Sequence, residues 1–308
     1  MDKVIAIVGP TAVGKTALSF TLADHFKTSL ISGDAYQIYK DMNIGTAKPT
    51  AAELAQYRHY LIDIEEPTDT YSAAKFCDMA GAAIHDLNEA GKIPILVGGT
   101  GLYVQSLLEG YEFGASKMDE TLRQQAQATI DGLAPDALQA YITRATDWEP
   151  ADWHELFANR HRLVRLVAAI EAGEGKTFVR TGKADGLVYD AYVIGLRLPR
   201  DVLYTRIEQR IDQMVQAGWI EEVKALLVRG ITPEVQAMKA IGYTELVQYI
   251  EGHRSLASVV EEIKKKTRHF AKRQLTWYKR MPYIHWYDKD QFASEEDLAQ
   301  AVITDITL

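Results

Sequence analysis

Cysteine and long apolar runs are scarce in this chain of 308 residues. The single cysteine, Cys77, excludes a disulfide framework and a cysteine-based zinc site, and it is typical of a reducing compartment. No apolar run approaches the roughly 18 residues of a membrane span, and the apolar stretch at the amino terminus is too short for a signal peptide. We therefore expect a cytoplasmic protein that has no membrane partner.

Basic residues are outnumbered as well, because 34 Lys and Arg stand against 42 Asp and Glu, a net charge of −8. This balance argues against a polyanionic partner for the protein as a whole. Basic residues are nevertheless concentrated in two segments, residues 254–280 and residues 157–183. Local basic faces of this kind are compatible with nucleic acid, although solvated helix faces would explain them equally well.

Strand and helix patterns alternate along the first hundred residues. Apolar, β-rich runs at residues 4–8, 29–32, 59–64 and 93–97 are separated by helical patterns such as residues 15–26 and 72–90. This alternation predicts βαβ units, and hence an α/β protein with a parallel sheet flanked by helices. The second strand is expected next to the first, with the polar residues after each strand at one edge of the sheet.

The strand pattern stops in the middle of the chain. Residues 114–187 show helical patterns at 119–129, 134–143 and 158–171, and a strand pattern returns at 192–198. Residues from 200 to about 280 are again helical, and a last strand is expected at 283–287. We therefore predict a core of residues 1–113 and 188–308 with a helical insertion domain of residues 114–187.

A phosphate-binding loop follows the first strand directly. The G-x-x-x-x-G-K-[ST] pattern is matched by Gly9, Pro10, Thr11, Ala12, Val13, Gly14, Lys15 and Thr16. Such a loop wraps backbone N–H groups around an anion at a helix N-terminus, Lys15 adds a positive charge, and the Thr16 hydroxyl is placed to bind Mg²⁺. The sequence thus predicts a P-loop fold of the kind that binds nucleotides such as ATP, but the loop alone does not specify the reaction.

Asp34 follows the second strand, where a carboxylate could face the phosphate pocket. It could accept a proton from a nucleophile or hold Mg²⁺ through water. An aspartate in a bare loop is more often a helix cap, so this position alone does not decide between the two roles.

Several further motifs share the order of a known family. After the P-loop come the segments D-A-Y-Q (34–37), N-I-G-T-A-K-P (43–49), Y-S-A (71–73), V-G-G-T-G-L-Y (97–103), R-L-V-R (162–165) and R-I-E-Q-R (206–210). Together they cover nearly the whole chain, and the chain resembles the bacterial tRNA dimethylallyltransferase family, also called tRNA isopentenyltransferases. Departures include Ala35, where the family usually has serine, and Thr244, where a basic residue is common.

The resemblance implies a magnesium-dependent reaction: transfer of a dimethylallyl group from dimethylallyl diphosphate to N6 of the adenosine just 3′ of the anticodon, in tRNAs that read codons beginning with U. It implies that Asp34 is the general base, that Thr100 positions the acceptor, and that Arg210 holds the diphosphate beside the P-loop. The residues that would contact tRNA are then Asp34, Ala35, Tyr36, Gln37, Thr100, Arg123, His161, Arg162, Leu163, Val164 and Arg165. We expect such an enzyme to be a monomer.

Three other functions stay open on the residues alone. The P-loop and Asp34 would also suit a small-molecule or nucleoside kinase that uses ATP. A prenyltransferase acting on free adenine nucleotides is a close variant, but the helical insertion and its arginines favour a large RNA acceptor. An RNA-binding P-loop regulator without catalytic activity is the non-enzymatic alternative.

Overall fold

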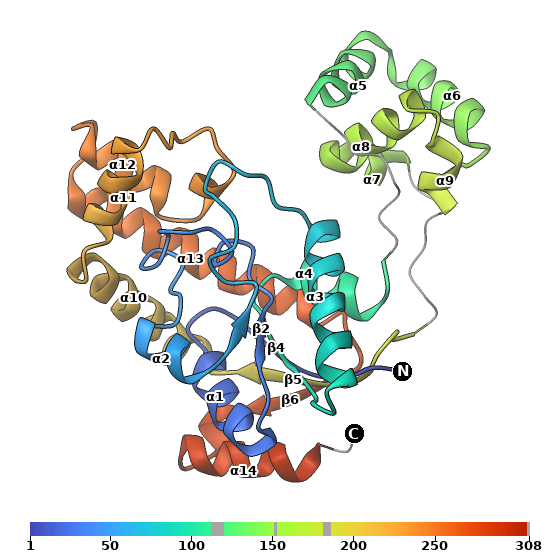
Figure 1. Ribbon diagram of the computed structural model, residues 1–308. Coiled ribbons are helices and arrows are strands. Elements are labelled where there is room, and N and C mark those ends of the chain that lie inside the picture. Colours follow the sequence, from blue (N-terminus) through green and yellow to red (C-terminus); the bar gives the residue numbers. More distant parts are fainter. Residues whose placement is uncertain (112–119, 151–152, 181–185, 307–308) are drawn as a thin grey trace. The chain divides into compact units, whose positions relative to one another are not determined.

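The computed structural model describes residues 1–111, 120–150, 153–180 and 186–306 (Figure 1). The chain divides into two compact units, one made of Met1–Leu108 and Leu187–Leu308 and the other of Glu109–Gly186. Among the described residues, no helix combines the length and the apolar character that crossing a membrane requires.

The first unit is built on a six-stranded sheet in which all neighbouring strands run parallel. The strands are β1 (Lys3–Val8), β2 (Leu30–Ser32), β3 (His59–Tyr60), β4 (Ile95–Val97), β5 (Asp190–Arg197) and β6 (Ile284–Asp288). Residues 4–8 of β1 are fully buried, which explains their uninterrupted apolar run, since a central parallel strand is covered on both faces. The α/β class with a parallel sheet flanked by helices is confirmed.

Helices cover both sides of this sheet. The helices of this unit are α1 (Lys15–Phe26), α2 (Ala51–Gln56), α3 (Ala73–Glu89), α4 (Gly101–Leu108), α10 (Arg200–Gln216), α11 (Trp219–Val228), α12 (Tyr243–Ile250), α13 (Leu256–Tyr278) and α14 (Glu295–Asp305), with 3-10 helices η1 (Ala237–Lys239) and η2 (Lys289–Gln291). Figure 1 shows α1 and α14 together on one side of the sheet, and α3, α4 and α13 on the other. The site described below lies at the carboxyl ends of the strands.

The strand order is β3-β2-β4-β1-β5-β6, so β4 lies between β1 and β2. The expectation that β2 is the neighbour of β1 was therefore wrong. The chain first extends outward from β2 to β3, and α3 then carries it back to insert β4 beside β1. The carboxyl ends of β1, β2 and β4 still share one edge, because all three strands are parallel.

The third strand is shorter than residues 59–64, the expected range. Leu61 and Asp63 have left-handed backbone angles (φ 63° and 56°), which an extended strand does not allow. Pairing ends after Tyr60, and the chain turns back so that the Ile64 and Glu65 N–H groups donate to the carbonyl of Ile38. Of the apolar side chains in this run, Leu61 is buried in the turn, whereas Ile64 is 40% exposed.

The helical region after residue 200 is interrupted three times. Gly218, with φ 101°, separates α10 from α11, residues 229–242 hold only the short η1, and residues 251–255 separate α12 from α13. The sequence analysis correctly expected helices between residues 200 and about 280, but it did not predict these breaks.

The second unit consists of helices around its own small core. They are α5 (Glu120–Gly132), α6 (Pro135–Thr146), α7 (Trp153–Ala158), α8 (Arg160–Glu171) and α9 (Gly175–Arg180). The core is formed by Ala126, Ile130, Leu138, Ile142, Leu156, Leu163, Val164, Leu166, Val167 and Ala168. The Asn159 side chain accepts a hydrogen bond from the Arg162 N–H and so caps the N-terminus of α8.

Candidate active site

The P-loop connects β1 to α1 through backbone angles that its glycines allow. Gly9 has φ 144°, and a Cβ there would lie 2.6 Å from the carbonyl oxygen of Leu196. The N-cap of α1, Gly14, provides no side-chain cap, so the first-turn amides of the helix keep their capacity to bind an anion. The Lys15 ammonium donates to the carbonyls of Gly9 (3.0 Å) and Pro10 (2.9 Å).

Three charged side chains act on one another in the cavity above this loop. Burial, followed by the charge of Arg210, lowers the pKa of Lys15 to about 7, and the carboxylate of Asp34 opposes the shift. Burial likewise lowers the pKa of Arg210, again against Asp34. Among the described residues, Arg210 makes no hydrogen bond or ion pair. A half-buried guanidinium that makes no ion pair among the described residues indicates a place where a ligand can supply an anion.

Two cavities adjoin at this cluster. The first, of about 630 Å³, is lined by the P-loop and by polar side chains of α10. The second, of about 610 Å³, has a more apolar wall that includes Ala35, Leu102 and Trp277. The residues that line both are Thr11, Ala12, Asp34, Thr46, Ala47, Gly99, Arg210, Phe270 and Gln274. Asp34 and Arg210 thus lie at the junction of the two cavities. The first suits a phosphate-bearing ligand, and the second suits a more apolar one.

Asp34 is fixed by its own loop. One carboxylate oxygen, Oδ1, accepts from the Tyr36 N–H (2.8 Å) and the Gln37 N–H (3.3 Å). The two bonds form an Asx-type turn and not the helix cap expected of a loop aspartate, because α2 begins only at Ala51. Among the described residues no hydrogen bond engages Oδ2, so one oxygen fixes the side chain and the other is available to a ligand.

Thr100 connects the end of β4 to the Asp34 loop. Its Oγ1 accepts from the Ala35 N–H (3.1 Å), and its own N–H donates to the carbonyl of Gly33 (3.4 Å). These bonds place the Thr100 hydroxyl beside Asp34 in the second cavity. Tyr36 lies in the same wall, where burial and the Asp34 charge raise the pKa of its phenol.

Gln37 lies in the first cavity with its side-chain amide engaged by the protein. Its Oε1 accepts from Ser32 Oγ (2.9 Å), and its Nε2 donates to the carbonyls of Thr46 and Ala47 (both 3.2 Å). The Gln37 side chain therefore connects β2 to the segment 43–48, an arrangement that the sequence did not suggest.

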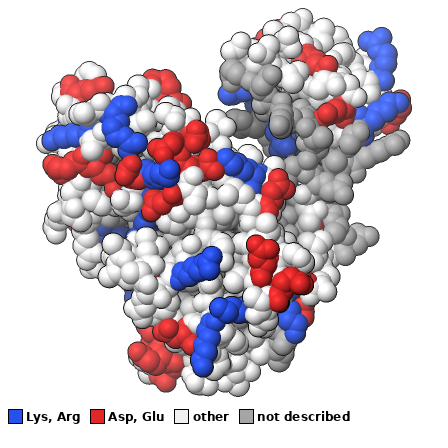
Figure 2. Space-filling model, viewed as in Figure 1, with Lys and Arg blue, Asp and Glu red and all other residues white. Residues whose placement is uncertain are grey.

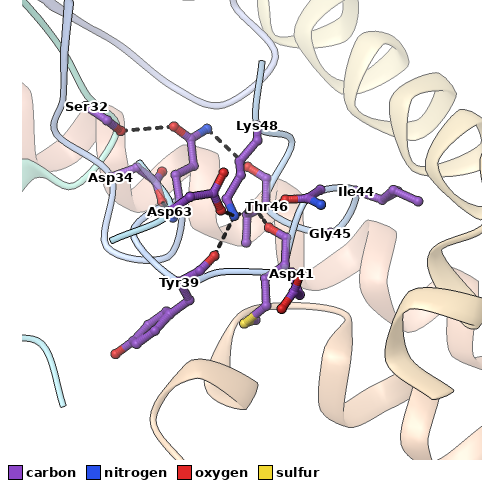
Figure 3. A network of polar contacts seen from close by, with 12 residues as sticks. Ser32, Asp34, Tyr39, Asp41, Ile44, Gly45, Thr46, Lys48 and Asp63 are labelled. Atoms are coloured by element: carbon purple, nitrogen blue, oxygen red, sulfur yellow. Dashed lines mark hydrogen bonds and ion pairs between the residues drawn. The ribbon is translucent and has the colours of Figure 1, made fainter. Parts of the chain in front are cut away.

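Lys48 fixes the same segment from inside the protein (Figure 3). Its side chain is 1% exposed, and its ammonium donates to the Tyr39 carbonyl, to Asn43 and to Asp63. Burial lowers the pKa of Lys48, while the partner Asp63 favours the charged form. The sequence singled out the motif around Lys48 only through the family resemblance.

Gln274 is a site residue that the sequence analysis missed. It lies on the buried face of α13, where Oε1 accepts from the Thr11 N–H (2.9 Å) and Nε2 donates to the Gly99 carbonyl (2.7 Å). It thereby joins the P-loop to the end of β4. The available signal was a polar residue in the buried stripe of a helix, at the spacing of Ala271 and Tyr278.

The structure divides the expected tRNA contacts of the second unit into two kinds. Arg123, Arg162 and Arg165 are exposed, and Arg165 lies over the ring of Phe178 at 5.6 Å. The side chains of Leu163 and Val164 pack in the helical core, so a ligand could reach only their backbone. His161 lies in α8, but its side chain falls outside the described residues.

The basic segment 254–280 is partly neutralised within the first unit. Its ion pairs are Arg254–Glu262, Lys264–Asp212, Lys264–Glu261, Lys266–Glu245, Lys266–Glu262 and Arg268–Glu208. Figure 2 shows the result on one face, where basic and acidic side chains alternate over the part of the molecule that holds α11 and α12. The exposed cations of this segment that make no ion pair among the described residues are Lys265, Lys272 and Arg273 in α13, and Lys279 and Arg280 directly after it.

The donor set at the P-loop suits a metal ion that is shared with a ligand. The Thr16 side chain lines the first cavity, and its hydroxyl makes no hydrogen bond among the described residues. Those residues contain no group of three or more His, Cys, Asp or Glu side chains that could hold a metal. Mg²⁺ keeps several waters and is commonly bound by few protein groups together with substrate phosphates, so this sparse set fits it.

Comparisons with known proteins agree on one family. A model of the IPP transferase family matches residues 37–281. The tRNA dimethylallyltransferase of Halalkalibacterium halodurans is 39% identical over 290 residues, which span 93% of this chain and 91% of that protein. That of Enterococcus faecalis is 40% identical over 290 residues, spanning 94% and 92%.

Solved structures show the same relationship. The crystal structure of tRNA delta(2)-isopentenylpyrophosphate transferase from Staphylococcus epidermidis matches with a TM-score of 0.71 at 36% identity, covering 99% of this chain and 98% of that chain. A eukaryotic dimethylallyltransferase acting on tRNA matches with a TM-score of 0.80 at 26% identity, covering 98% and 78%.

Proposed function

Since the chain belongs to the IPP transferase family, the family of the tRNA dimethylallyltransferases, we propose that it prenylates tRNA by the reaction that its cavities would accommodate. The donor is dimethylallyl diphosphate, and the acceptor is N6 of the adenosine 3′ of the anticodon, in tRNAs that read codons beginning with U. The observation that carries the proposal is the meeting of the P-loop cavity and the more apolar cavity at Asp34 and Arg210.

The donor's diphosphate would lie on the P-loop amides of residues 9–16, beside Lys15 and Arg210. As the bond between the allylic carbon and the diphosphate oxygen breaks, negative charge grows on that oxygen, and the two cations stabilise it in a site with little water. Thr16 would hold Mg²⁺ there together with diphosphate oxygens, and the ion would supply further neutralisation of the leaving group.

The acceptor adenine would enter the second cavity from the anticodon loop, as enzymes that modify bases require. Its N6 forms the new bond to the allylic carbon, and the proton that N6 loses passes to Asp34 Oδ2. The Thr100 hydroxyl and the Ala35–Gln37 segment would position the base. Arg123 and residues 161–165 of the insertion would bind the tRNA backbone, a contact that suits exposed arginines.

All of these groups come from one chain, which supports action as a monomer. A tRNA substrate also supports a place in the cytoplasm. The kinase alternative would use the same P-loop and Asp34, but family membership and the apolar second cavity favour prenyl transfer.

The test combines protein, Mg²⁺, dimethylallyl diphosphate and unmodified tRNA, followed by nucleoside analysis. We expect N6-dimethylallyladenosine and one diphosphate for each transfer. A second reaction with ATP and nucleosides in place of the prenyl donor separates the alternative. Phosphorylated product in that reaction, with no prenylated nucleoside in the first, would refute the proposal.

A further inference from the structure

The segment of residues 43–48, called here the 43–48 loop, forms a wall common to both cavities. Thr46 and Ala47 line both of them, Gly45 lines only the second and Lys48 only the first. The loop has no strand or helix of its own. Its position therefore depends on side chains that reach it from other elements.

One carboxylate holds the first half of this loop. Glu222, in the first turn of α11, accepts from the N–H groups of Asn43 and Ile44 through Oε2 (both 2.7 Å) and from the N–H of Gly45 through Oε1 (3.1 Å). Oε1 also accepts from the Tyr243 hydroxyl at 2.7 Å. Four donors converge on one anion, and hydrogen bonds to an ionised acceptor are roughly twice as strong as neutral ones.

Two aromatic rings pack closely against the loop beside this contact. A Cβ on Gly45 would lie 2.2 Å from Trp219 Nε1 and 2.5 Å from the Tyr243 ring. Gly45 therefore lies flat against these two rings, while Glu222 holds the three amides. The loop is fixed from α11 and α12, outside the motifs that form the site.

The second half of the loop carries this position on to Asp34. The carbonyls of Thr46 and Ala47 accept from Gln37 Nε2 (3.2 Å each), and the Gln37 N–H donates to Asp34 Oδ1 (3.3 Å). A shift of the 43–48 loop would therefore move Gln37 and reorient the carboxylate. The P-loop is held separately, by Gln274.

We propose that Glu222 is a positioning residue for the transfer reaction, acting on Asp34 through the 43–48 loop and Gln37. The Glu222 carboxylate sets the orientation of the Asp34 carboxylate toward N6, while the P-loop that would bind the diphosphate keeps its separate anchor, Gln274. This inference rests on the proposed function, in which Asp34 takes the N6 proton.

Glu222→Gln is the discriminating variant. It preserves volume but turns one acceptor atom into an NH₂ group, which would face either the amides of Asn43 and Ile44 or the Gly45 amide and the Tyr243 hydroxyl. The matched control is Glu221→Gln on the same helical turn. Glu221 is 69% exposed, and its ion pair is a long surface contact of 3.9 Å with the Lys224 ammonium.

We expect E222Q to lower kcat on the order of 10²-fold, since a misplacement of about 1 Å can cost that much, with KM for the donor within about twofold of the wild type. E221Q should match the wild type in both constants. A wild-type kcat in E222Q, or a loss expressed as a raised donor KM, would overturn the proposal.

Tyr243→Phe covers the case in which E222Q does not fold, because it removes one donor to Glu222 and keeps the ring. It should lower kcat several-fold at an unchanged donor KM, and a wild-type kcat in Y243F would also contradict the inference. If the wild-type enzyme itself makes no prenylated nucleoside, the proposed function fails instead, so the two failures are distinguishable.

Discussion

Binding of a diphosphate to the P-loop should be accompanied by proton uptake, because about half of the Lys15 side chains are neutral at pH 7 in the free protein. Burial and then the charge of Arg210 lower the pKa of Lys15 to about 7, against the opposing effect of Asp34. A diphosphate placed on the P-loop stabilises the ammonium form. The pKa of Lys15 therefore returns toward its ordinary value in the complex, and the difference appears as protons taken up.

The size of this uptake follows from the pKa of the free protein. With a pKa of about 7, Lys15 is about nine-tenths neutral at pH 8, about half neutral at pH 7 and about one-tenth neutral at pH 6. Complete protonation in the complex then takes up about 0.9, 0.5 and 0.1 proton at these three pH values. Since the complex binds more protons than the free protein, affinity falls as pH rises above 7, by up to about tenfold per pH unit.

Calorimetric titration with an unreactive alkyl diphosphate and Mg²⁺, in two buffers of different ionisation enthalpy, measures the proton count at pH 8. Arg210→Gln removes a charge that lowers the pKa of Lys15, so its uptake should be smaller. Asp34→Asn removes the charge that raises the pKa of Lys15, so its uptake at pH 7 should be larger. Tight binding by the wild type with no proton uptake at pH 8 would refute the reasoning.

Substitutions at three residues test the assigned roles. Asp34→Ala should lower kcat by ~10²-fold or more with little change in tRNA affinity, measured by steady-state kinetics and filter binding; an unchanged kcat would remove Asp34 from the mechanism. Arg210→Gln should raise donor KM and lower kcat, together on the order of 10²-fold in kcat/KM, and Arg210→Lys should recover only part because an ammonium lacks the guanidinium fork; full activity in either variant would contradict the diphosphate role. Gln274→Ala should lose both loop contacts and lower kcat/KM for the donor by about tenfold, and wild-type kinetics in that variant would show that the P-loop keeps its position without Gln274.

The sequence predicted correctly those elements whose structure depends on residues adjacent in the chain. The buried run of β1, the P-loop turn and the start of α1 all depend on adjacent residues, so their residue types sufficed. The strand expected at residues 59–64 failed for a nearby reason, because Leu61 and Asp63 adopt left-handed angles that their residue types do not announce. A short apolar run is compatible with a buried strand and with a partly buried turn, so its composition alone does not distinguish the two.

Contacts between distant parts of the chain could not be predicted in the same way. Gln274 reaches Thr11 and Gly99, and Glu222 reaches the amides of the 43–48 loop, across well over a hundred residues in each case. A buried glutamine or glutamate shows only that some polar partner exists. Which partner it has depends on the strand order, and the sequence analysis had β2 in the wrong place.

The spacing between the two proposed substrates depends on α13 as much as on the sheet. Gln274 bonds both the P-loop and Gly99, the Tyr278 hydroxyl donates to the Gly98 carbonyl at 3.3 Å, and a Cβ on Gly101 would lie 2.5 Å from Trp277. Prenyl transfer needs the leaving group, the allylic carbon and N6 in line, and a rigid helix maintains such an alignment better than two separate loops. The long helix thus holds the P-loop that would bind the donor and the β4 end that would position the acceptor at one fixed distance, while Glu222 and the 43–48 loop orient the base between them.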